Sequence, residues 1–588
     1  MTERRTIASI WDEAVAEQRT NPAYLVEEQP GEWREVSWSE AAQAVDELAH
    51  GLLALGARKG DVFGILAHTT LEWSLFDFAL AHIGAVAAPI YPASSAAECR
   101  HILSDSEAIG VLVEGDEELA SIEESRSLPG LRHVLTFADL DDVRARGREH
   151  AAQHPDAVRA AADAITDEDL FTFIYTSGTT GAPKGCMILN RNYFEMVRSA
   201  LLVHDFFRHT DVLLLYLPLA HNFGRYMHLL GPRAGMTIAF CPDPRRLGDV
   251  MPAVRPTLMP TVPRVLEKVH TAVSANFDAA AGIKKRLIGW ALSVGRRVSE
   301  LRQRGEAVPR GLAIKHRIAD KLVYSKVKAR LGGRMRAVIS GGAPLAKEIA
   351  GFFHTLDLLI LEGYGQTEGT TASNCNLPER FRFGTVGPAL PNIEVRVADD
   401  GEILVRGPTV FAGYFKNEQA TREALGEDGW LRTGDVGELD EDGFLKVTDR
   451  KRDIIVTAGG KNLSPQNIEN ALKSSPYVSQ ALVIGDRRPY VSALITLDED
   501  EIGKWAQGRG LNGDVAGLAG REEVRELIQA VVDDVNAGLA RFEQVRAFAI
   551  LPRDFSAEEN EVTPTLKLRR RIVEDHFADE IEALYSVA

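Results

Sequence analysis

The most constraining feature of the chain is an eleven-residue stretch, Tyr175-Thr176-Ser177-Gly178-Thr179-Thr180-Gly181-Ala182-Pro183-Lys184-Gly185, which directly follows the apolar run Phe171–Tyr175. Its glycines let backbone N–H groups approach an anion, its hydroxyls donate hydrogen bonds or reach a metal, and its lysine supplies a flexible point charge. The stretch therefore predicts a loop that binds the phosphates of a nucleoside triphosphate. The alternative is a Ser/Thr/Gly surface turn, which would account for three or four of these residues but not for all eleven.

The spacing in this loop differs from the other common phosphate loop, G-x-x-x-x-G-K-[ST]. Lys184 follows a proline, and no Ser or Thr comes after it. Kinase and GTPase interpretations are therefore disfavoured.

Further motifs follow along the chain. They are Ser340-Gly341-Gly342-Ala343-Pro344-Leu345, Glu362-Gly363-Tyr364-Gly365-Gln366-Thr367-Glu368, Trp430-Leu431-Arg432-Thr433-Gly434-Asp435, Asp449-Arg450-Lys451-Arg452-Asp453, Gly459-Gly460-Lys461-Asn462 and Thr563-Pro564-Thr565-Leu566-Lys567-Leu568-Arg569-Arg570. With the loop, they resemble in sequence and order the signatures of the adenylate-forming superfamily of acyl-CoA synthetases, luciferases and peptide-synthetase adenylation domains. The resemblance extends from about Trp38 to about Arg570.

Composition narrows the class of protein. With 588 residues, of which 45% are hydrophobic, the chain exceeds what a single core usually supports, so at least two domains are expected. Asp and Glu outnumber Lys and Arg by 84 to 67, and the net charge of −17 argues against nucleic acid as a partner. An anionic nucleotide must then be held by local dipoles and a few cationic side chains.

The cysteines and the N-terminal segment indicate the compartment. Cys99, Cys186, Cys241 and Cys375 are scattered without C-x-x-C spacing, which suggests neither zinc nor a disulfide framework. The polar, acidic N-terminal segment lacks the apolar core of a signal peptide, and no run reaches the length of a membrane span. We expect a cytoplasmic protein.

Hydrophobic periodicity alternates between helix and strand. A helix capped at Ser37 is followed by the strand-like run Val62–Ala67, a helical segment from Thr70 to Ile83 and the strand-like run Ala85–Tyr91. This β–α–β order predicts an α/β fold with parallel sheets, and the family resemblance implies a large multi-layer N-terminal domain of this kind. Asp399-Asp400-Gly401 indicates a hairpin turn in a more β-rich region.

After Arg452, alternating strand and helix signals predict a small, separate α/β domain, including strands at Val478–Ile484 and Val491–Leu497. We predict domains at residues 1–449 and 450–588. The first binds AMP and the acyl group, and the second is a mobile lid.

The stretch between Glu267 and Gly333 is long, basic and largely helical. Its length and position resemble an insertion in long-chain fatty acyl-CoA synthetases, which favours a long-chain acyl substrate. Two interpretations of its charge stay open: solvated surface helices, or helices that contact anionic lipid headgroups at the inner face of the membrane.

The resemblance assigns roles in the first reaction step, in which a fatty carboxylate attacks the α-phosphorus of ATP and expels pyrophosphate. Because two anions are brought together, the site must supply positive charge. Glu368 is the implied Mg²⁺ ligand, and Thr176 offers a second oxygen. Lys567 matches the lysine that contacts the α-phosphate and the substrate carboxylate. His221 matches a position beside the reacting carboxylate, although a lone histidine is often only structural.

For the nucleotide, the resemblance implies that Asp435 binds both ribose hydroxyls, that Arg450 helps to hold the sugar and that Tyr364 flanks adenine. The remaining implied nucleotide and CoA positions are Thr176, Ser177, Gly178, Thr179, Thr180, Gly181, Lys184, Gly341, Gly342, Ala343, Glu362, Gly363, Gly365, Gln366, Thr367, Gly459, Gly460 and Lys461. The sequence after His221, Asn222-Phe223-Gly224-Arg225, departs from the Phe-Glu-Arg ending of long-chain relatives and leaves the chain-length preference open.

In the second step, the thiol of CoA attacks the acyl adenylate. The resemblance implies that the small domain rotates between the steps about Arg452, which removes Lys567 and brings Gly459 to the thiol channel. The sequence thus predicts an AMP-forming long-chain fatty acid–CoA ligase. The alternatives are a fatty acyl-AMP ligase that passes the acyl group to a carrier protein, a luciferase-like oxygenase and a non-catalytic nucleotide- or acyl-binding regulator. A homodimer is compatible with the sequence, which leaves the oligomeric state open.

Overall fold

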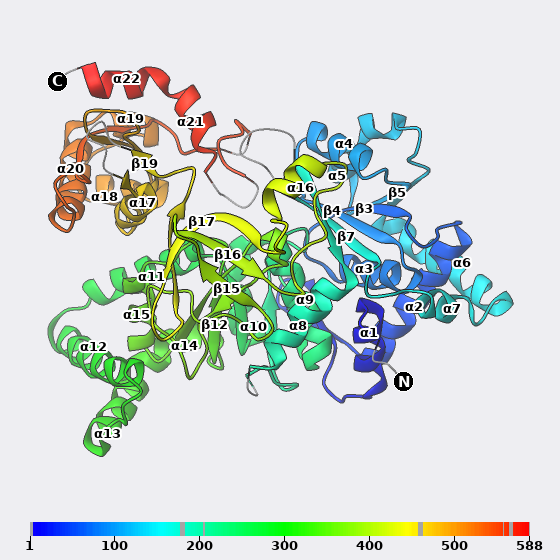
Figure 1. Ribbon diagram of the computed structural model, residues 1–588. Coiled ribbons are helices and arrows are strands. Elements are labelled where there is room, and N and C mark those ends of the chain that lie inside the picture. The colour runs from blue at the N-terminus through cyan, green and yellow to red at the C-terminus, as the bar shows by residue number, and fades with distance from the viewer. Residues whose placement is uncertain are drawn as a thin grey trace.

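The computed structural model describes residues 4–176, 183–203, 206–456, 462–556, 558–563 and 568–586, with the side chains of Val456 and Asn462 excepted (Figure 1). Its elements form two α/β layers, a β-rich sheet and a small α/β unit at the C-terminal end. The predicted α/β fold class, with a large N-terminal part and a smaller C-terminal part, is confirmed.

The first layer is a six-stranded sheet in the order β6-β5-β3-β4-β7-β8. Neighbouring strands are parallel except β7 and β8, which form an antiparallel pair. Residues on both faces of β3 and β4 are buried, which explains their continuous apolar sequence. The strands are β3 (Val62–Leu66), β4 (Val86–Ile90), β5 (Gly110–Val113), β6 (His133–Thr136), β7 (Leu170–Thr176) and β8 (Lys184–Leu189).

Helices of this layer begin at side-chain caps. The hydroxyl of Ser37 accepts a hydrogen bond from the Glu40 N–H, as the sequence predicted, and Thr70 caps the next helix in the same way. Gly147 lets α6 lie directly against α2, because a Cβ there would approach the Glu47 carbonyl oxygen to 1.8 Å. The helices are α2 (Trp38–Ala54), α3 (Leu71–Ile83), α4 (Ala96–Asp105), α5 (Asp116–Ser121), α6 (Leu140–Gln153) and α7 (Ala157–Asp163), with short 3-10 turns at Glu123–Ser127 and Phe137–Asp139.

The second layer is an eight-stranded sheet in the order β14-β13-β12-β11-β9-β10-β1-β2, parallel except for the two edge strands. Its strands are β1 (Tyr24–Gln29), β2 (Glu32–Val36), β9 (Val212–Leu215), β10 (Thr237–Phe240), β11 (Leu258–Thr261), β12 (Ala337–Ser340), β13 (Leu359–Tyr364) and β14 (Asn374–Cys375). Its helices are α1 (Ile7–Ala16), α8 (Asn190–Leu201), α9 (Asn222–Ala234), α10 (Leu247–Val254), α11 (Pro263–Asp278) and α15 (Lys347–Thr355), with 3-10 turns at Pro244–Arg246 and Thr367–Gly369.

A buried ion pair joins the two layers. Arg225 on α9 and Asp77 on α3 are both fully buried and paired, and the guanidinium also lies over the rings of Trp73 and Phe171. Burial raises the pKa of Asp77 to about 6, although Arg225 opposes that shift. Removing one partner of such a pair typically costs about 3–5 kcal/mol, because the other charge is left buried and unpaired, so both residues are needed where α9 meets the first layer.

The β-rich region is an antiparallel sheet of β15 (Glu394–Val397), β16 (Glu402–Arg406), β17 (Leu431–Leu439) and β18 (Leu445–Arg450), with α16 (Glu418–Ala424) beside it. The hairpin predicted at Asp399-Asp400-Gly401 joins β15 to β16, and Gly401 has the positive φ of +84° that its turn requires.

The C-terminal unit has its own hydrophobic core, which begins at Ile455, whereas the main core ends at Leu445 and the adjoining Val447. We therefore keep the boundary at 449/450 as a proposal. Its strands are β19 (Ile455–Val456), β20 (Asn462–Leu463), β21 (Val478–Ile484), β22 (Val491–Leu497) and β23 (Val545–Ile550), and its helices are α17 (Pro465–Lys473), α18 (Glu499–Gln507), α19 (Val515–Ala519), α20 (Glu522–Ala537), α21 (Arg570–His576) and α22 (Ala578–Ser586).

The predicted basic stretch forms a helical excursion that projects from the second layer (Figure 1). It comprises α12 (Gly282–Gln303), α13 (Arg310–Ala319), a π-helical turn (Asp320–Tyr324) and α14 (Ser325–Arg330). Across the ranges that the structure describes, no helix combines the length and the apolar character needed to cross a bilayer.

Candidate functional site

One cavity of roughly 2850 Å³ extends between the N-terminal layers and the C-terminal unit. Every predicted site residue that the structure describes lines this cavity: Thr176, Lys184, His221, Gly341, Gly342, Ala343, Glu362, Gly363, Tyr364, Gly365, Gln366, Thr367, Glu368, Asp435, Arg450 and Arg452. Ser177, Gly178, Thr179, Thr180, Gly181, Gly459, Gly460, Lys461 and Lys567 lie outside the described residues.

The glycine-rich stretch connects β7 to β8. Thr176, the last residue of β7, pairs across the antiparallel ladder with Lys184, the first residue of β8. The strands therefore fix both ends of the loop at the edge of the first sheet, where they face the cavity.

Glu368 lies at the same edge and is held by a residue that sequence reasoning missed. The hydroxyl of Tyr414 donates a hydrogen bond to Glu368 Oε1 at 2.6 Å, and Lys184 Nζ lies 5.2 Å from the centre of the Tyr414 ring. Thr176 is adjacent, with Oγ1 4.0 Å from the sulfur of Cys186, a thiol whose pKa is raised by burial and by Glu368. Carboxylate and hydroxyl oxygens are the donors that Mg²⁺ prefers, so these residues fit the ion.

Asp435 lies on β17, opposite Arg450 on β18. Asp435 Oδ2 accepts a hydrogen bond of 2.7 Å from the hydroxyl of Tyr364, and Asp435 Oδ1 lies 3.6 Å from Arg450 Nε. Burial, followed by the Asp435 charge, raises the pKa of Tyr364, so the phenol remains a hydrogen-bond donor. These two neighbours orient the carboxylate of Asp435, which lines the cavity.

Two segments bring main chain close to the cavity. Gly342 follows β12 with a φ of +85°, which favours glycine, and Gly365 is forced by packing because a Cβ there would lie 1.8 Å from the Thr371 carbonyl oxygen. Between them, Glu362 Oε1 accepts a hydrogen bond from the Leu345 N–H at 3.0 Å. Burial raises the pKa of Glu362 to about 8, so this carboxyl is largely protonated at neutral pH.

His221 caps the N-terminus of α9. Its Nδ1 accepts a hydrogen bond of 3.2 Å from the Phe223 N–H, and its ring lines the cavity. The neighbouring Asn222 accepts a hydrogen bond from Tyr193 and donates one of 3.4 Å to the Thr367 carbonyl oxygen. This network connects α8, α9 and the motif around Thr367, and the sequence contained no local signal for it.

Part of the remaining cavity lining is apolar. Leu247 and Met251 on α10, and Val265 and Val269 on α11, contribute side chains spaced four residues apart, so each pair lies on one helical face. Gly248 lines the cavity between them, and a Cβ there would meet no atom within 4 Å. Such a lining fits an aliphatic chain.

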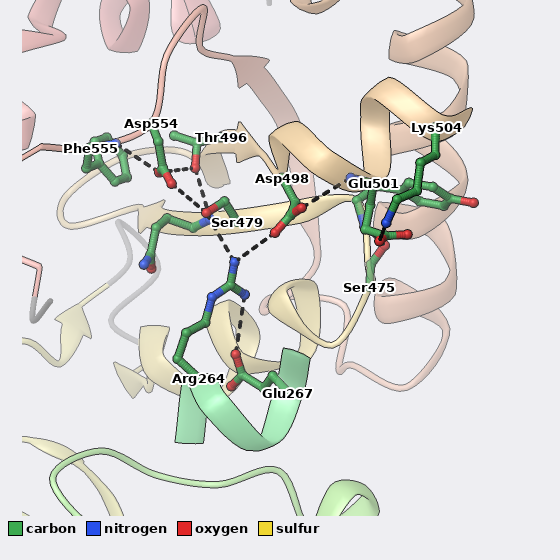
Figure 2. A network of polar contacts seen from close by, with 12 residues as sticks. Arg264, Glu267, Ser475, Ser479, Thr496, Asp498, Glu501, Lys504, Asp554 and Phe555 are labelled. Carbon is green, nitrogen blue, oxygen red and sulfur yellow. Dashed lines mark hydrogen bonds and ion pairs between the residues drawn. The ribbon is translucent and has the colours of Figure 1, made fainter. Parts of the chain in front are cut away.

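Among the described residues, polar contacts on two sides of the cavity join the C-terminal unit to the N-terminal part. Arg569 Nη2, two residues after Lys567, lies 3.7 Å from Glu98 Oε1 on α4. On the other side, Arg264 on α11 reaches Asp498 Oδ2 at 3.1 Å and Ser479 Oγ at 3.3 Å (Figure 2). The side chain of Asp554 accepts hydrogen bonds from Ser479 and Thr496 and so orders the surface that Arg264 meets.

Comparisons with known proteins agree with this geometry. The model of the AMP-binding enzyme family matches residues 11–415, and that of the AMP-binding enzyme C-terminal domain matches residues 452–588. The chain is 40% identical over 582 residues to the long-chain-fatty-acid–CoA ligase FadD15 of Mycobacterium bovis, covering 97% of this chain and 96% of that protein. It is 31% identical to human long-chain-fatty-acid–CoA ligase 6, covering 95% and 83% of the two chains.

Solved structures support the fold. The adenylation domain of a carboxylate reductase from Mycobacterium chelonae superposes with a TM-score of 0.75 at 22% identity, covering 99% of this chain and 91% of that one. The anthranilate–CoA ligase AuaEII, solved with anthranoyl-AMP, gives a TM-score of 0.72 at 20% identity over 98% of each chain. The chain therefore belongs to the AMP-binding enzyme family of the adenylate-forming superfamily.

Proposed function

We propose that the protein is an ATP-dependent, AMP-forming long-chain fatty acid–CoA ligase. The observation that carries this proposal is one cavity lined both by the motifs predicted to bind the nucleotide and by apolar side chains of α10 and α11. Relatives that match nearly the whole chain carry the name long-chain-fatty-acid–CoA ligase, which supports the same substrate class.

In the first half-reaction, the fatty carboxylate attacks the α-phosphorus of ATP and pyrophosphate leaves. Lys184 and Lys567 supply positive charge to the phosphates, and His221 lies beside the carboxylate. Glu368 and Thr176 would hold Mg²⁺, which neutralises charge on the phosphate oxygens when bound. Asp435 accepts hydrogen bonds from the ribose hydroxyls, with Arg450 beside it.

In the second half-reaction, the CoA thiol attacks the acyl adenylate carbonyl and AMP leaves. A free thiol with a pKa of about 8.5 is only slightly ionised at neutral pH, so its positioning matters. The C-terminal lid is proposed to rotate about Arg452 between the steps, which replaces the Lys567 segment by the one that contains Gly459, Gly460 and Lys461.

Mass spectrometry tests the function directly. Purified protein incubated with fatty acids of mixed length, ATP, Mg²⁺ and CoA should form long-chain acyl-CoA, AMP and pyrophosphate, and omission of Mg²⁺ should abolish them. Accumulation of acyl adenylate without consumption of CoA would instead favour the fatty acyl-AMP ligase that serves a carrier protein. Absence of pyrophosphate release with every acid would refute both activities.

The proposal extends to location and assembly. We propose a cytoplasmic enzyme that meets the inner face of the membrane peripherally, since its acyl substrate partitions into lipid. A homodimer is a further proposal, and sedimentation equilibrium of the purified protein checks it by comparing the measured mass with the 64.4 kDa of one chain.

A further inference from the structure

The helical excursion carries a charge opposite to that of the rest of the chain. Residues 282–330 contain 14 Lys and Arg and 3 Asp and Glu, a net charge of +11. The whole chain has a net charge of −17, so the residues outside the excursion carry −28. Such segregation concentrates a positive potential on one projecting element.

Much of this charge is not used inside the protein. The exposed cations on the two long helices and the π-helical turn include the six residues Lys284, Lys285, Arg286, Lys315, Arg317 and Lys321. Within the ranges that the structure covers, the side chain of none of the six is paired with a carboxylate. Their charges are therefore available to an external anion.

The same helices also expose apolar side chains. Five of the eight large hydrophobic residues that are exposed among the described residues lie here, at 36% to 86% exposure: Ile283, Trp290, Ile314, Ile318 and Leu322. Ile314 and Ile318 are one turn apart on α13, and Leu322 follows in the π-helical turn. The hydroxyl of Tyr324 donates a hydrogen bond to the Ala291 carbonyl oxygen, which brings the segments around Leu322 and Trp290 to the same level of the hairpin.

These apolar groups are not the exposed rim of the core. The excursion has its own small core, to which α12 contributes Ile288, Ala291 and Val294, and to which Ala319 and Val323 contribute from the opposite segment. The exposed side chains lie outside that core. We call the six cations and the five exposed apolar residues the hairpin patch.

We propose that the hairpin patch docks on the surface of an anionic lipid bilayer. Apolar side chains flanked by Lys and Arg are what the interface of such a bilayer accommodates, because the former enter the acyl boundary while the latter meet the headgroups. A nucleic acid would leave the apolar residues without a partner, and a second hairpin patch would be repelled by like charge.

The hairpin patch is connected along the chain to the apolar lining of the cavity. α11 contributes Val265 and Val269 to the apolar lining and leads at its C-terminal end directly into α12. If the proposed function holds, docking places the element that continues from α11, a helix of the apolar lining, at the phase in which a long-chain acid is dissolved. The docking itself is measurable without any activity.

Vesicle co-sedimentation tests the proposal, with vesicles of phosphatidylglycerol and phosphatidylcholine compared with phosphatidylcholine alone. The wild type should bind the anionic vesicles at low salt, and this binding should weaken as the salt concentration rises. The apolar variant Ile314→Ser/Ile318→Ser/Leu322→Ser and the charge variant Lys284→Gln/Lys285→Gln/Arg286→Gln should each bind about tenfold more weakly or worse. Circular dichroism should show that both remain folded, because all six residues are exposed.

Matched control variants remove exposed apolar side chains or exposed positive charges outside the excursion. The variants Leu439→Ser/Phe542→Ser and Arg132→Gln/Arg146→Gln/Arg159→Gln change exposed residues outside the excursion and should bind like the wild type. Equal weakening by these controls would overturn the proposal, and so would wild type that fails to bind anionic vesicles at low salt. Retention of the wild type on a soluble polyanion without vesicle binding would also overturn it and would favour a nucleic acid or an acidic protein. Fatty acid–CoA ligase activity that is absent while vesicle binding persists would refute the proposed function alone.

Discussion

The contact between Arg264 and Asp498 is predicted to set how long the lid stays in the orientation seen here. In this orientation Arg569, close in sequence to Lys567, lies against Glu98 on the far side of the cavity. We propose that this orientation serves adenylate formation; the Arg264 contact holds the C-terminal unit from the α11 side (Figure 2). If the lid rotates between the half-reactions, this contact must break.

The magnitude follows from the burial of the pair. The side chains of Arg264 and Asp498 are 25% and 18% exposed, so they are less screened than a surface pair, which is typically worth about 0.2–1 kcal/mol. The added hydrogen bond to Ser479 brings the contact to about 1–2 kcal/mol. That free energy changes the ratio of two lid orientations about 5- to 30-fold.

Separate assays of the half-reactions measure this effect. Arg264→Gln and Asp498→Asn should slow fatty-acid-dependent exchange of pyrophosphate into ATP, whereas thioester formation from preformed acyl adenylate should be unchanged or faster. Asparagine retains the cap that Asp498 provides to α18. Lys504→Gln is the matched control, because its 2.6 Å ion pair with Glu501 lies within the lid.

The double variant tests whether the two residues act through each other. The combined effect of Arg264→Gln and Asp498→Asn should be smaller than the sum of the single effects, because either change alone already breaks the contact. Additive losses, or equal losses in both half-reactions from a folded single variant, would refute the reasoning.

Three further predictions concern the cavity. Lys567→Ala should lose adenylate formation but still convert preformed acyl adenylate to thioester, and Gly459→Leu should do the reverse; equal loss of both activities in both folded variants would exclude the two-orientation mechanism. Gly248→Phe should fill open space beside the apolar lining and lower the activity with long-chain acids at least tenfold relative to short-chain acids. Gly503→Phe, at an exposed position on helix α18, is the control and should not change this ratio. An unchanged chain-length profile in Gly248→Phe would contradict the prediction. Burial raises the pKa of Glu362 from 4.5 to about 8, so the folded protein keeps this proton at pH values where the unfolded chain has lost it. The free energy of unfolding should therefore fall by up to about 5 kcal/mol as the pH rises from 4.5 to about 8. In thermal unfolding measured across this pH range, Glu362→Gln should lose stability less steeply than the wild type. An identical pH dependence in the two proteins would contradict the prediction.

Local features of the fold were predictable because their causes are local. The cap at Ser37 and the turn at Asp399-Asp400-Gly401 depend on a few adjacent residues, and both are found where the sequence indicated. The strands predicted at Val478–Ile484 and Val491–Leu497 also have those bounds in the structure.

Partners in three dimensions were not predictable in the same way. Tyr414 is 46 residues from Glu368, and Asp498 is 234 residues from Arg264, so neither contact produces a periodic or local signal. The family resemblance supplied the residues expected to meet ligands, but not the neighbours that orient them. Tyr414 belongs to this second group, because its phenol donates a hydrogen bond to Glu368. Tyr364 was expected to flank adenine, but its hydrogen bond to Asp435 was not predicted.

The cap at His221 reconciles two interpretations that sequence reasoning treated as alternatives, a structural histidine and one beside the reacting carboxylate. Because Nδ1 accepts the Phe223 N–H, the neutral ring carries its proton on Nε2. In that tautomer Nε2 is a hydrogen-bond donor, the kind of group that suits a carboxylate oxygen, and the N-terminus of α9 adds a favourable dipole. Protonation of Nδ1 would replace the acceptor by a donor and break the cap. The structural role therefore sets the chemical state in which His221 would meet the substrate.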